Sequence, residues 1–380
     1  MSTSDAFVRV AIIMAGGSGE RFWPVSRRNH PKQLLRLTSP TDTMLGEAVS
    51  RISPLIPPER IYVVTGEHLV EVIREAGVGV PSDNVIAEPC KRNTGGCLAF
   101  ATAHVLAHHG GDAAAISMAV ITADHLIGDS ERFRRTVDVA LEMAERKGVL
   151  ATHGIVPTRP ETGYGYIQAK DIDDPVLDAR SRSESDGISV FPVAAFHEKP
   201  NHDQADDFIA TGSYFWNSGM FFWRIDTFLE ELDAARPDMA EAVRGMHEAI
   251  KANDKATVRS IFEALESISI DYALMEHAKQ VVVVRADYPW DDVGAWTSLD
   301  RTREHDEHGN VARGGPVLID THNSIVYNDA GAEEMAVSVV GMDSVIVVVS
   351  KDGILVIPKD RAQDVRHAVA ELKARGAKQV

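Results

Sequence analysis

The chain has 380 residues, of which 44% are hydrophobic and 25% charged, and it carries a formal net charge of −17. This composition excludes collagen-like and low-complexity chains, supports a large core and, at this length, favours two domains. The acidic balance argues against a general nucleic-acid-binding surface, which is usually basic, but a local cationic pocket for a small anion remains compatible with it. Apolar runs such as "VIVVV" at 345–349 are too short to cross a bilayer, so neither nucleic acid nor a membrane is an expected partner.

The N-terminus and the cysteines favour a cytoplasmic location. The first residues, "MSTSDAFVRVAIIMAGG", lack the basic-then-apolar layout of a secretory signal. Cys90 and Cys97 have a spacing that matches no zinc or redox motif, which predicts buried thiols in a reducing compartment.

Strand and helix patterns alternate along the first two-thirds of the chain. Apolar runs predict strands at 8–13, 61–65, 116–122, 149–155 and 281–285, and helices are expected at 44–52, 67–76, 94–109 and 131–147. Asn93 or Thr94 is the expected N-cap of the third helix. The apolar, β-branched character of several strands indicates that they are covered on both faces. Together with the alternation of strands and helices, this predicts an α/β fold with a Rossmann-like mixed, mostly parallel sheet.

The predicted secondary structure changes towards the C-terminus. The pattern of residues 225–279 predicts mainly helix, whereas after residue 310 short apolar runs between turns predict a small β domain or a β-solenoid. An amphipathic helix is expected at 362–375. The charged segment 300–312 is interpreted as a solvated linker, although its "HDEH" contains metal-competent side chains, so the predicted domains are 1–300 and 310–380.

A glycine turn, "AGGSG" at 15–19, follows the first predicted strand. Gly16, Gly17 and Gly19 allow positive φ angles and let backbone N–H groups approach phosphate oxygens closely. The turn lacks the Gly-Lys ending of a P-loop and the Gly-x-Gly-x-x-Gly spacing of dinucleotide-binding folds. A tight structural turn would explain the glycines alone.

Two cations follow that turn. Arg21 offers forked donors and Lys32 a compact charge, and both suit phosphate. Pro24 and Pro31 stiffen the loop that carries them. Glycines and cations together predict a phosphate-binding loop.

Aspartates at two distant places are candidate metal ligands. Asp124 in "VITADHLIGD" comes directly after a predicted strand, where open α/β sheets bind ligands. Asp291 and Asp292 lie in "YPWDDVGAW". Mg²⁺ is usually held by one or two carboxylates plus phosphate oxygens. Taken singly, an aspartate such as Asp124 is more often a helix cap or turn residue, and a packed aromatic turn would explain Asp291 and Asp292.

These stretches resemble motifs of the sugar-nucleotide pyrophosphorylases, nucleotidyltransferases that join a sugar 1-phosphate to a nucleoside triphosphate. The resemblance is carried by "AGGSGERFWPVSRRNHPKQLL", "ADH" and "WDDVGAW", spans about residues 8–300, and extends into the C-terminal tail. It implies a GT-A-like domain followed by a short β-helix-like domain. It also implies nucleotide binding by Ala15, Gly16, Gly17 and Gly19, catalytic charge stabilisation by Arg21 and Lys32, and a Mg²⁺ ion held by Asp124 and Asp292. The chain departs from the family at Glu20, where an uncharged residue is usual, and the role of Glu20 is left open.

Further motifs resemble the family's sugar and base sites. "GYGY", "FHEKP" and "WNSG" are similar to its sugar-site segments, which implies sugar-binding roles for Gly165, Glu198, Lys199 and Asn217. Without the resemblance, a solvated turn would explain the Glu-Lys pair, and backbone groups could satisfy the amide. "EPCKRNT" resembles the base-site segment of the guanylyl-transferring members, so that Glu88 would accept from guanine N1–H and N2–H₂, while Arg92 has a structural alternative. The implied substrates are GTP and mannose 1-phosphate.

Three alternatives stand beside this interpretation. One is a sugar nucleotidyltransferase for another nucleoside triphosphate or for a heptose 1-phosphate, and another is a non-catalytic sensor of nucleotide sugars. The third, a dinucleotide-dependent oxidoreductase, is disfavoured by the glycine spacing. The oligomeric state is left open, with a homodimer among the options.

Overall fold

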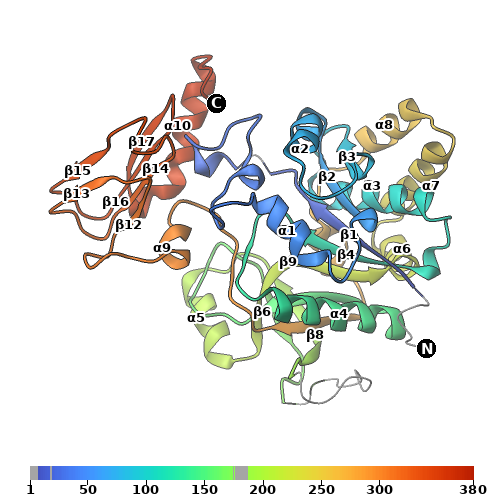
Figure 1. Ribbon diagram of the computed structural model, residues 1–380. Helices are drawn as coiled ribbons and strands as arrows, with labels where there is room; N and C mark the ends of the chain where they lie inside the picture. Colours follow the sequence, from blue (N-terminus) through green and yellow to red (C-terminus); the bar gives the residue numbers. More distant parts are fainter. Residues whose placement is uncertain (1–6, 18, 174, 176–186) are drawn as a thin grey trace. The chain divides into compact units, whose positions relative to one another are not determined.

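The computed structural model describes residues 7–17, 19–173, 175 and 187–380 (Figure 1). Two compact units are present, and their boundaries do not follow chain order. Unit 1 comprises Met1–Ala15, Ala48–Thr122 and Ile127–Pro289, and unit 2 comprises Gly16–Glu47, Ala123–Leu126 and Trp290–Val380. The glycines of the turn, its cations and residues 123–126 after the strand at 116–122 therefore belong to the same unit as the C-terminal β region.

Unit 1 is built on a nine-stranded sheet with the order β3-β2-β1-β4-β9-β6-β10-β8-β7. Five strands match the sequence prediction closely: β1 (Val8–Met14), β2 (Ile61–Gly66), β4 (Ile116–Thr122), β6 (Leu150–Ile155) and β10 (Val281–Ala286). The other four were not predicted as strands: β3 (Val85–Glu88), β7 (Tyr166–Ala169), β8 (Val190–His197) and β9 (Tyr214–Arg224).

The sheet is mixed, as predicted, but less parallel than predicted. Strands β3, β2, β1 and β4 are paired in parallel in this order, and β6 is parallel to β10. Strand β9 is antiparallel to β4, β6 and β7, and β8 is antiparallel to β7 and β10. Insertion of β9 between β4 and β6 separates the two parallel regions.

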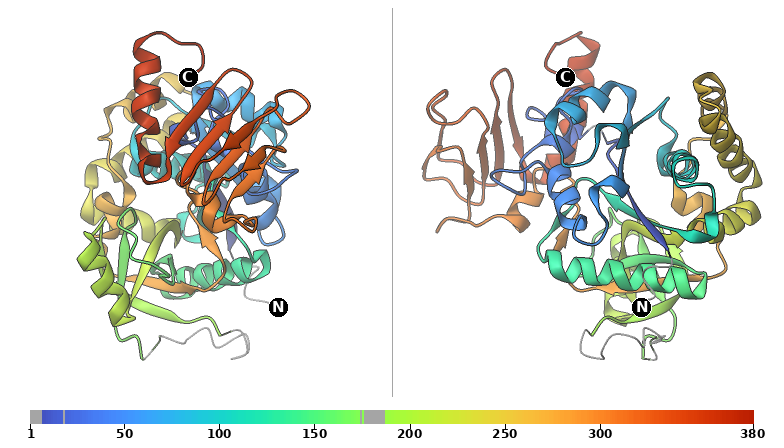
Figure 2. Two further views of the ribbon diagram at one scale, coloured as in Figure 1. Left: turned by 90° about the vertical axis from the view of Figure 1, so that its left-hand side faces the viewer. Right: turned by 45° about the vertical axis from the view of Figure 1, so that its right-hand side comes forward.

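Helices cover both faces of this sheet. Helices α3 (Asn93–His108), α6 (Ile225–Ala235) and α7 (Pro237–Lys251) share one core cluster with β1 and β4, whereas α4 (Ser130–Lys147) contacts β4, β6 and β9. Figures 1 and 2 show α4 running apart from α3 and α7. The remaining α-helices of the described residues before position 290 are α1 (Met44–Ile52), α2 (Val70–Ala76), α5 (His202–Thr211) and α8 (Lys255–Ala264).

The predicted cap of α3 is wrong. The N-cap position is Arg92, and no side chain caps the helix there. The Thr94 hydroxyl accepts from the Ile270 N–H at 2.9 Å, and the Asn93 side chain accepts from the adjacent Thr94 N–H at 2.8 Å. The Thr94 hydroxyl is therefore used outside the helix, whereas the Asn93 side chain bonds an N–H of the first helical turn from inside the helix.

Unit 2 contains the short strands expected after residue 310. Strands β12 (Val311–Arg313), β14 (Ile325–Asn328) and β16 (Val345–Val349) pair in parallel, and β17 (Ile354–Pro358) completes the sheet in antiparallel fashion. Strands β13 (Val317–Ile319) and β15 (Ser338–Val340) form a second, two-stranded parallel sheet. Consecutive parallel pairing of short strands agrees with the predicted solenoid-like region, whose strands Figure 2 shows beside α10.

The last helix, α10 (Val365–Ala374), is preceded by a 3₁₀ segment over Lys359–Asp364, so the predicted start at 362 falls within that segment. Unit 2 also contains α9 (Ser298–Thr302) and the two-residue strand β11 (Trp290–Asp291), and the two-residue strand β5 (Leu126–Ile127) begins in it. Among the described residues, no helix combines the length and apolar character that a bilayer crossing needs.

One aromatic cluster anchors the cationic loop within unit 2. Phe22 and Trp23 are buried with Trp296, Tyr327 and Val365. The Phe22 and Trp296 rings lie 5.1 Å apart, as do those of Trp296 and Tyr327. The Trp296 indole N–H donates to the Trp23 carbonyl at 3.1 Å. The loop that carries Arg21 and Lys32 is thus fixed by residues from the C-terminal third of the chain.

Candidate active site

Three of the motifs meet at the ammonium group of Lys32. The side chain is 6% exposed and begins a 3₁₀ turn directly after Pro31. Its Nζ donates to Oδ2 of Asp124 at 2.8 Å and to the backbone carbonyl of Asp292 at 2.9 Å. The glycine-turn loop, the residues after β4 and the "WDDVGAW" segment therefore share one charged group, all within unit 2.

The glycine turn lies directly against Lys32. Gly19 has φ +62°, and a Cβ built there would lie 2.5 Å from Cβ of Lys32. The Ser26 hydroxyl donates to the Gly19 carbonyl at 2.7 Å. A side chain at position 19 would be strained by the backbone and would also displace Lys32, so glycine is required at this close approach.

Asp124 is charged at neutral pH. Burial raises the pKa of Asp124, but the nearby Lys32 ammonium and His125 outweigh burial and hold the pKa below its usual value. The His125 ring accepts at Nδ1 from the Trp290 indole N–H at 3.2 Å. This hydrogen bond is a second link, besides Lys32, between the "ADH" and "WDDVGAW" segments.

The "WDDVGAW" segment stores backbone strain beside Asp292. Val293 has φ +47°, which is rare for a β-branched residue. Asp291, 4% exposed, forms an ion pair with Arg301 at 2.7 Å and accepts from the Val293 N–H at 2.8 Å. Asp292 accepts from the Gly294 N–H at 3.2 Å. Asp291 is thus committed to a buried structural pair, whereas Asp292 is the aspartate whose carbonyl contacts Lys32.

Arg21 and Glu20 diverge from one another. One Arg21 Nη atom lies 3.5 Å from the Gly294 carbonyl, and its Nε is buried with no hydrogen-bond partner in the described part of the chain. Glu20 accepts from the ammonium of Lys373 on α10. The departure from the family at Glu20 therefore coincides with an ion pair to the C-terminal helix.

The remaining turn residues differ in exposure. Ala15 closes β1, where its N–H donates to the Val64 carbonyl at 2.8 Å and its carbonyl accepts from the Thr65 hydroxyl at 2.9 Å. Gly16 and Gly17 are exposed, and a Cβ at Gly17 would meet no atom within 4 Å. A ligand can therefore approach these two exposed glycines without meeting a side chain of their own.

The donor set around Lys32 fits a magnesium ion. The Asp124 and Asp292 carboxylates offer oxygen atoms, and one or two carboxylates are what Mg²⁺ takes from a protein when phosphates provide the rest. Groups of three or more His, Cys, Asp and Glu residues that could hold a metal are not found in the residues the structure describes.

In the charged segment 300–312, Asp306 accepts from the N–H groups of His308 and Asn310 at 2.9 and 2.8 Å, so it stabilises a turn.

A second cluster lies in unit 1. The Asn217 N–H donates to the Gly165 carbonyl at 2.8 Å, and a Cβ at Gly165 would lie 2.9 Å from Oε2 of Glu198. The other Glu198 oxygen pairs with the Lys199 ammonium at 2.7 Å. Lys199 has φ +45°, an uncommon value for a lysine. The four predicted sugar-site residues therefore lie together, each next to at least one of the others.

Asp271, which the sequence reasoning missed, belongs to the same cluster. Its carboxylate accepts from the Asn217 amide at 2.7 Å. Burial raises the pKa of Asp271, the bond from Asn217 acts in the opposite direction, and the charge of Glu198 raises the pKa further. Asp271 begins a π-helical turn, Asp271–Met275, a geometry frequent at functional sites. An acidic residue inside the apolar run "SISIDYALM" was the available signal.

Glu88 ends strand β3 elsewhere in unit 1. Burial raises the pKa of Glu88 to about 7, although a hydrogen bond with the Cys97 thiol acts in the opposite direction. Arg92 donates to the backbone carbonyls of Lys91 and Glu263, which favours the structural alternative for Arg92. Cys90 and Cys97 are both free thiols, of which Cys97 is buried and Cys90 half-buried.

Comparison with known proteins defines the class. Residues 10–309 match the family model described as nucleotidyl transferase, and residues 314–372 match the one described as MannoseP isomerase/GMP-like beta-helix domain. The chain belongs to the nucleotidyl transferase family and is an enzyme, a nucleotidyltransferase with a C-terminal β-helix-like region.

Individual relatives narrow this class. The chain is 38% identical to a mannose-1-phosphate guanylyltransferase of Klebsiella pneumoniae over 95% of this chain and 73% of the relative. It is also 38% identical to one of Escherichia coli (strain K12), over 96% of this chain and 73% of the relative. The crystal structure of a Thermus thermophilus protein named mannose-1-phosphate geranyltransferase superposes with a TM-score of 0.81 at 34% identity, covering 97% of this chain and 100% of that one.

Proposed function

We propose that the chain transfers the guanylyl group of GTP to α-D-mannose 1-phosphate, releasing pyrophosphate and forming GDP-mannose. The observation that carries this proposal is the convergence of the cationic loop, Asp124 and Asp292 on the Lys32 ammonium. The two curated relatives, named for the same activity, support the choice of substrates.

The reaction is an in-line displacement at phosphorus. A phosphate oxygen of mannose 1-phosphate attacks the α-phosphorus of GTP, an O–P bond forms, and the bond to the leaving pyrophosphate breaks. No side-chain nucleophile is needed, so catalysis comes from positioning and from charge stabilisation. Arg21 and Lys32 oppose the charge of the triphosphate and of the leaving pyrophosphate. Gly16, Gly17 and Gly19 offer backbone groups to the nucleotide. Ala15, whose N–H and carbonyl are bonded to Val64 and Thr65, is assigned to the nucleotide site by its place directly before Gly16.

We assign the magnesium ligands to Asp124 and Asp292. A bound Mg²⁺ would supply further neutralisation of phosphate charge. The low pKa of Asp124 supports this role, since a metal ligand must be ionised. Without Mg²⁺, the Lys32 ammonium partly balances the negative charge of the Asp124 carboxylate.

In unit 1, we assign hexose binding to Gly165, Glu198, Lys199 and Asn217, and add Asp271. Glu198 and Asp271 are acceptors for sugar hydroxyls, and Lys199 is a donor to the sugar phosphate. Glu88 is assigned to the Watson–Crick edge of guanine, where an ionised carboxylate accepts two N–H groups that adenine does not offer.

The test is a substrate matrix. The four nucleoside triphosphates are each combined with mannose 1-phosphate, glucose 1-phosphate and a heptose 1-phosphate, and pyrophosphate release is measured with Mg²⁺. The proposal expects the highest kcat/KM for GTP with mannose 1-phosphate. Faster turnover with another pair would select the alternative nucleotidyltransferase, and no pyrophosphate release with any of these pairs would contradict the proposal.

The two-domain division at 1–300 and 310–380 stays a proposal, supported by family matches that end at residue 309 and resume at 314. The homodimer and the cytoplasmic location also remain predictions from the sequence.

A further inference from the structure

We propose that unit 2 carries a second anion site, in which Arg303 and Arg313 bind a phosphate-type oxyanion on a small molecule. The site lies where the end of helix α9 meets strands β12 and β14. None of the residues assigned to GTP, mannose 1-phosphate or Mg²⁺ lines it, so it goes beyond the proposed function.

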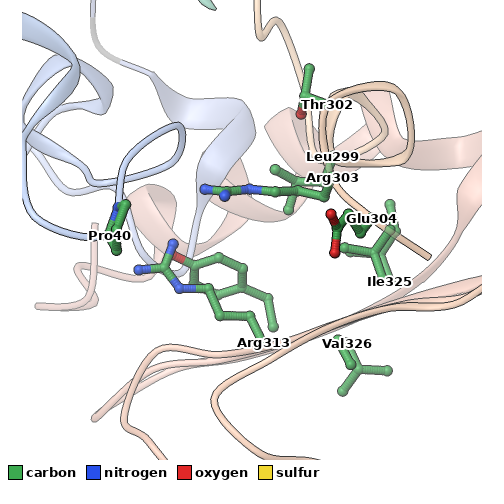
Figure 3. A pocket seen from close by; sticks show the side chains of 11 residues that line it. Pro40, Leu299, Thr302, Arg303, Glu304, Arg313, Ile325 and Val326 are labelled. Carbon is green, nitrogen blue, oxygen red and sulfur yellow. The ribbon is translucent and has the colours of Figure 1, made fainter. Parts of the chain in front are cut away.

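The site is a real concavity of suitable size. Its volume is about 440 Å³, within the range of small-molecule sites. Leu299, Ile325 and Val326 supply an apolar side, and the two arginines supply the polar side (Figure 3). Such a pocket suits a molecule with a charged group and a carbon body.

Both guanidinium groups are held in place by backbone. An Arg313 Nη1–H donates to the Arg36 carbonyl at 2.7 Å, and an Arg303 Nη2–H donates to the neighbouring Leu37 carbonyl. The Arg313 guanidinium also lies 5.0 Å from the centroid of the Tyr327 ring. These contacts fix two like charges beside each other and use only part of the donors that each guanidinium offers.

No carboxylate neutralises this pair in the part of the chain that the structure describes. Neither Arg303 nor Arg313 forms an ion pair within the described residues. Figure 3 shows that the two guanidinium groups point towards Pro40, and that the Glu304 carboxylate lies on the opposite side of the pocket. Burial lowers the pKa of Arg303 and the charge of Arg313 lowers it further, whereas Tyr327 and Glu47 act in the opposite direction. The Glu47 carboxylate is itself bonded to the Thr38 hydroxyl.

An oxyanion would relieve this repulsion. Guanidinium forks match phosphate oxygens bidentately, and two of them match a dianion. The charge could belong to free phosphate or pyrophosphate, or to the phosphoryl group of a sugar phosphate. The shared chemistry is the phosphate-type oxyanion, and the experiment separates these sources.

The test is calorimetric titration of the full chain, without Mg²⁺, with inorganic phosphate, inorganic pyrophosphate and mannose 1-phosphate. The wild-type protein is compared with Arg303→Gln/Arg313→Gln, with Ala312→Trp, with Lys32→Ala and with the control Arg361→Gln/Arg366→Gln. Ala312 is an exposed residue that lines the pocket, so we expect a tryptophan there to narrow the pocket while both arginines are kept. Arg361 and Arg366 are exposed arginines of the same unit outside the pocket.

The proposal expects one anion-binding event that both pocket variants weaken at least 10-fold and that Lys32→Ala and the control variant retain. The anion that binds most tightly identifies the source. If the double variant does not fold, Ala312→Trp decides alone. Binding in Ala312→Trp equal to wild type, equal loss in the control variant, or no binding event that survives in Lys32→Ala would overturn it.

Discussion

Lys32 concentrates the chemistry of unit 2 in one buried side chain. Its ammonium contacts Asp124, the Asp292 carbonyl and, at 5.7 Å, the face of the Phe22 ring. Removing one partner of a buried ion pair leaves the other charge uncompensated, which costs more than an exposed pair would. Asp124 is about one-third exposed, so water can reach it and limit that cost.

Lys32→Ala is therefore expected to lower turnover at least 100-fold while the protein stays folded, because the charge that opposes the leaving pyrophosphate is lost. Pyrophosphate release and the thermal midpoint are measured together. Lys351→Ala, which removes an exposed lysine of the same unit, serves as control. A Lys32→Ala rate close to wild type would remove Lys32 from the catalytic set.

Glu88 predicts a pH-dependent affinity for GTP. With a pKa of about 7, Glu88 is mostly protonated at pH 6 and mostly ionised at pH 8. If only the ionised carboxylate accepts from guanine, KM for GTP should fall about 10-fold from pH 6 to pH 8. Glu88→Gln should abolish that trend, which separates it from titration of the triphosphate itself. A trend of the same size in Glu88→Gln would contradict the assignment.

At the level of elements, the sugar cluster depends on the close approach of β7, β8 and β9. Asn217 lies on β9, Gly165 immediately precedes β7, and Glu198 immediately follows β8. A Cβ at Gly165 would come too close to the Glu198 carboxylate and would lie 3.4 Å from Cβ of Asn217.

Gly165→Ala should therefore raise KM for mannose 1-phosphate about 10-fold or more and leave KM for GTP unchanged, because the added methyl group displaces Glu198. Gly163→Ala is the matched control, since a Cβ there meets only the flexible end of Glu161, at 3.2 Å. Steady-state kinetics with each substrate varied in turn gives the answer. Equal effects of the two alanines on mannose 1-phosphate would argue for a general loop disturbance.

The elements also show what local sequence can predict. Helix α1 matches its predicted bounds at 44–52, and β4 matches 116–122, because periodicity and apolar runs are local signals. Strand β9 was not predicted because "YFWNSGMFFWR" is apolar on both faces and interrupted by polar residues and a glycine. Asp271 was missed because its partner Asn217 lies 54 positions away along the chain.

At the level of the whole molecule, the chain order conceals how the units are built. The motifs predicted residues that the structure brings together at Lys32. The predicted domain of residues 1–300 contains the cationic loop, and Phe22 and Trp23 of this loop share a core cluster with Val365 and Val369 of α10. Such pairings over more than 300 positions leave no local pattern to read.

This core predicts that the C-terminal helix influences nucleotide binding. Val365→Ala, at a fully buried site, should cost about 2 kcal/mol of unfolding free energy and weaken GTP binding, because its cluster supports the loop beside Arg21. Val243→Ala, at an equally buried site in α7 of unit 1, should lower stability similarly and leave GTP affinity unchanged. Denaturant unfolding and calorimetry measure the two effects. Unchanged GTP affinity in Val365→Ala would disconnect the C-terminal core from the loop.

The most direct measurement of the central claim is the magnesium dependence of GTP binding in the wild-type chain, in Asp124→Asn and in Asp292→Asn. If the two carboxylates hold the ion beside the triphosphate, Mg²⁺ should strengthen GTP binding at least 10-fold in the wild type and much less in either variant. Affinities without the ion should remain within a few-fold of one another. An equal gain from Mg²⁺ in all three proteins, or no gain in the wild type, would contradict the account.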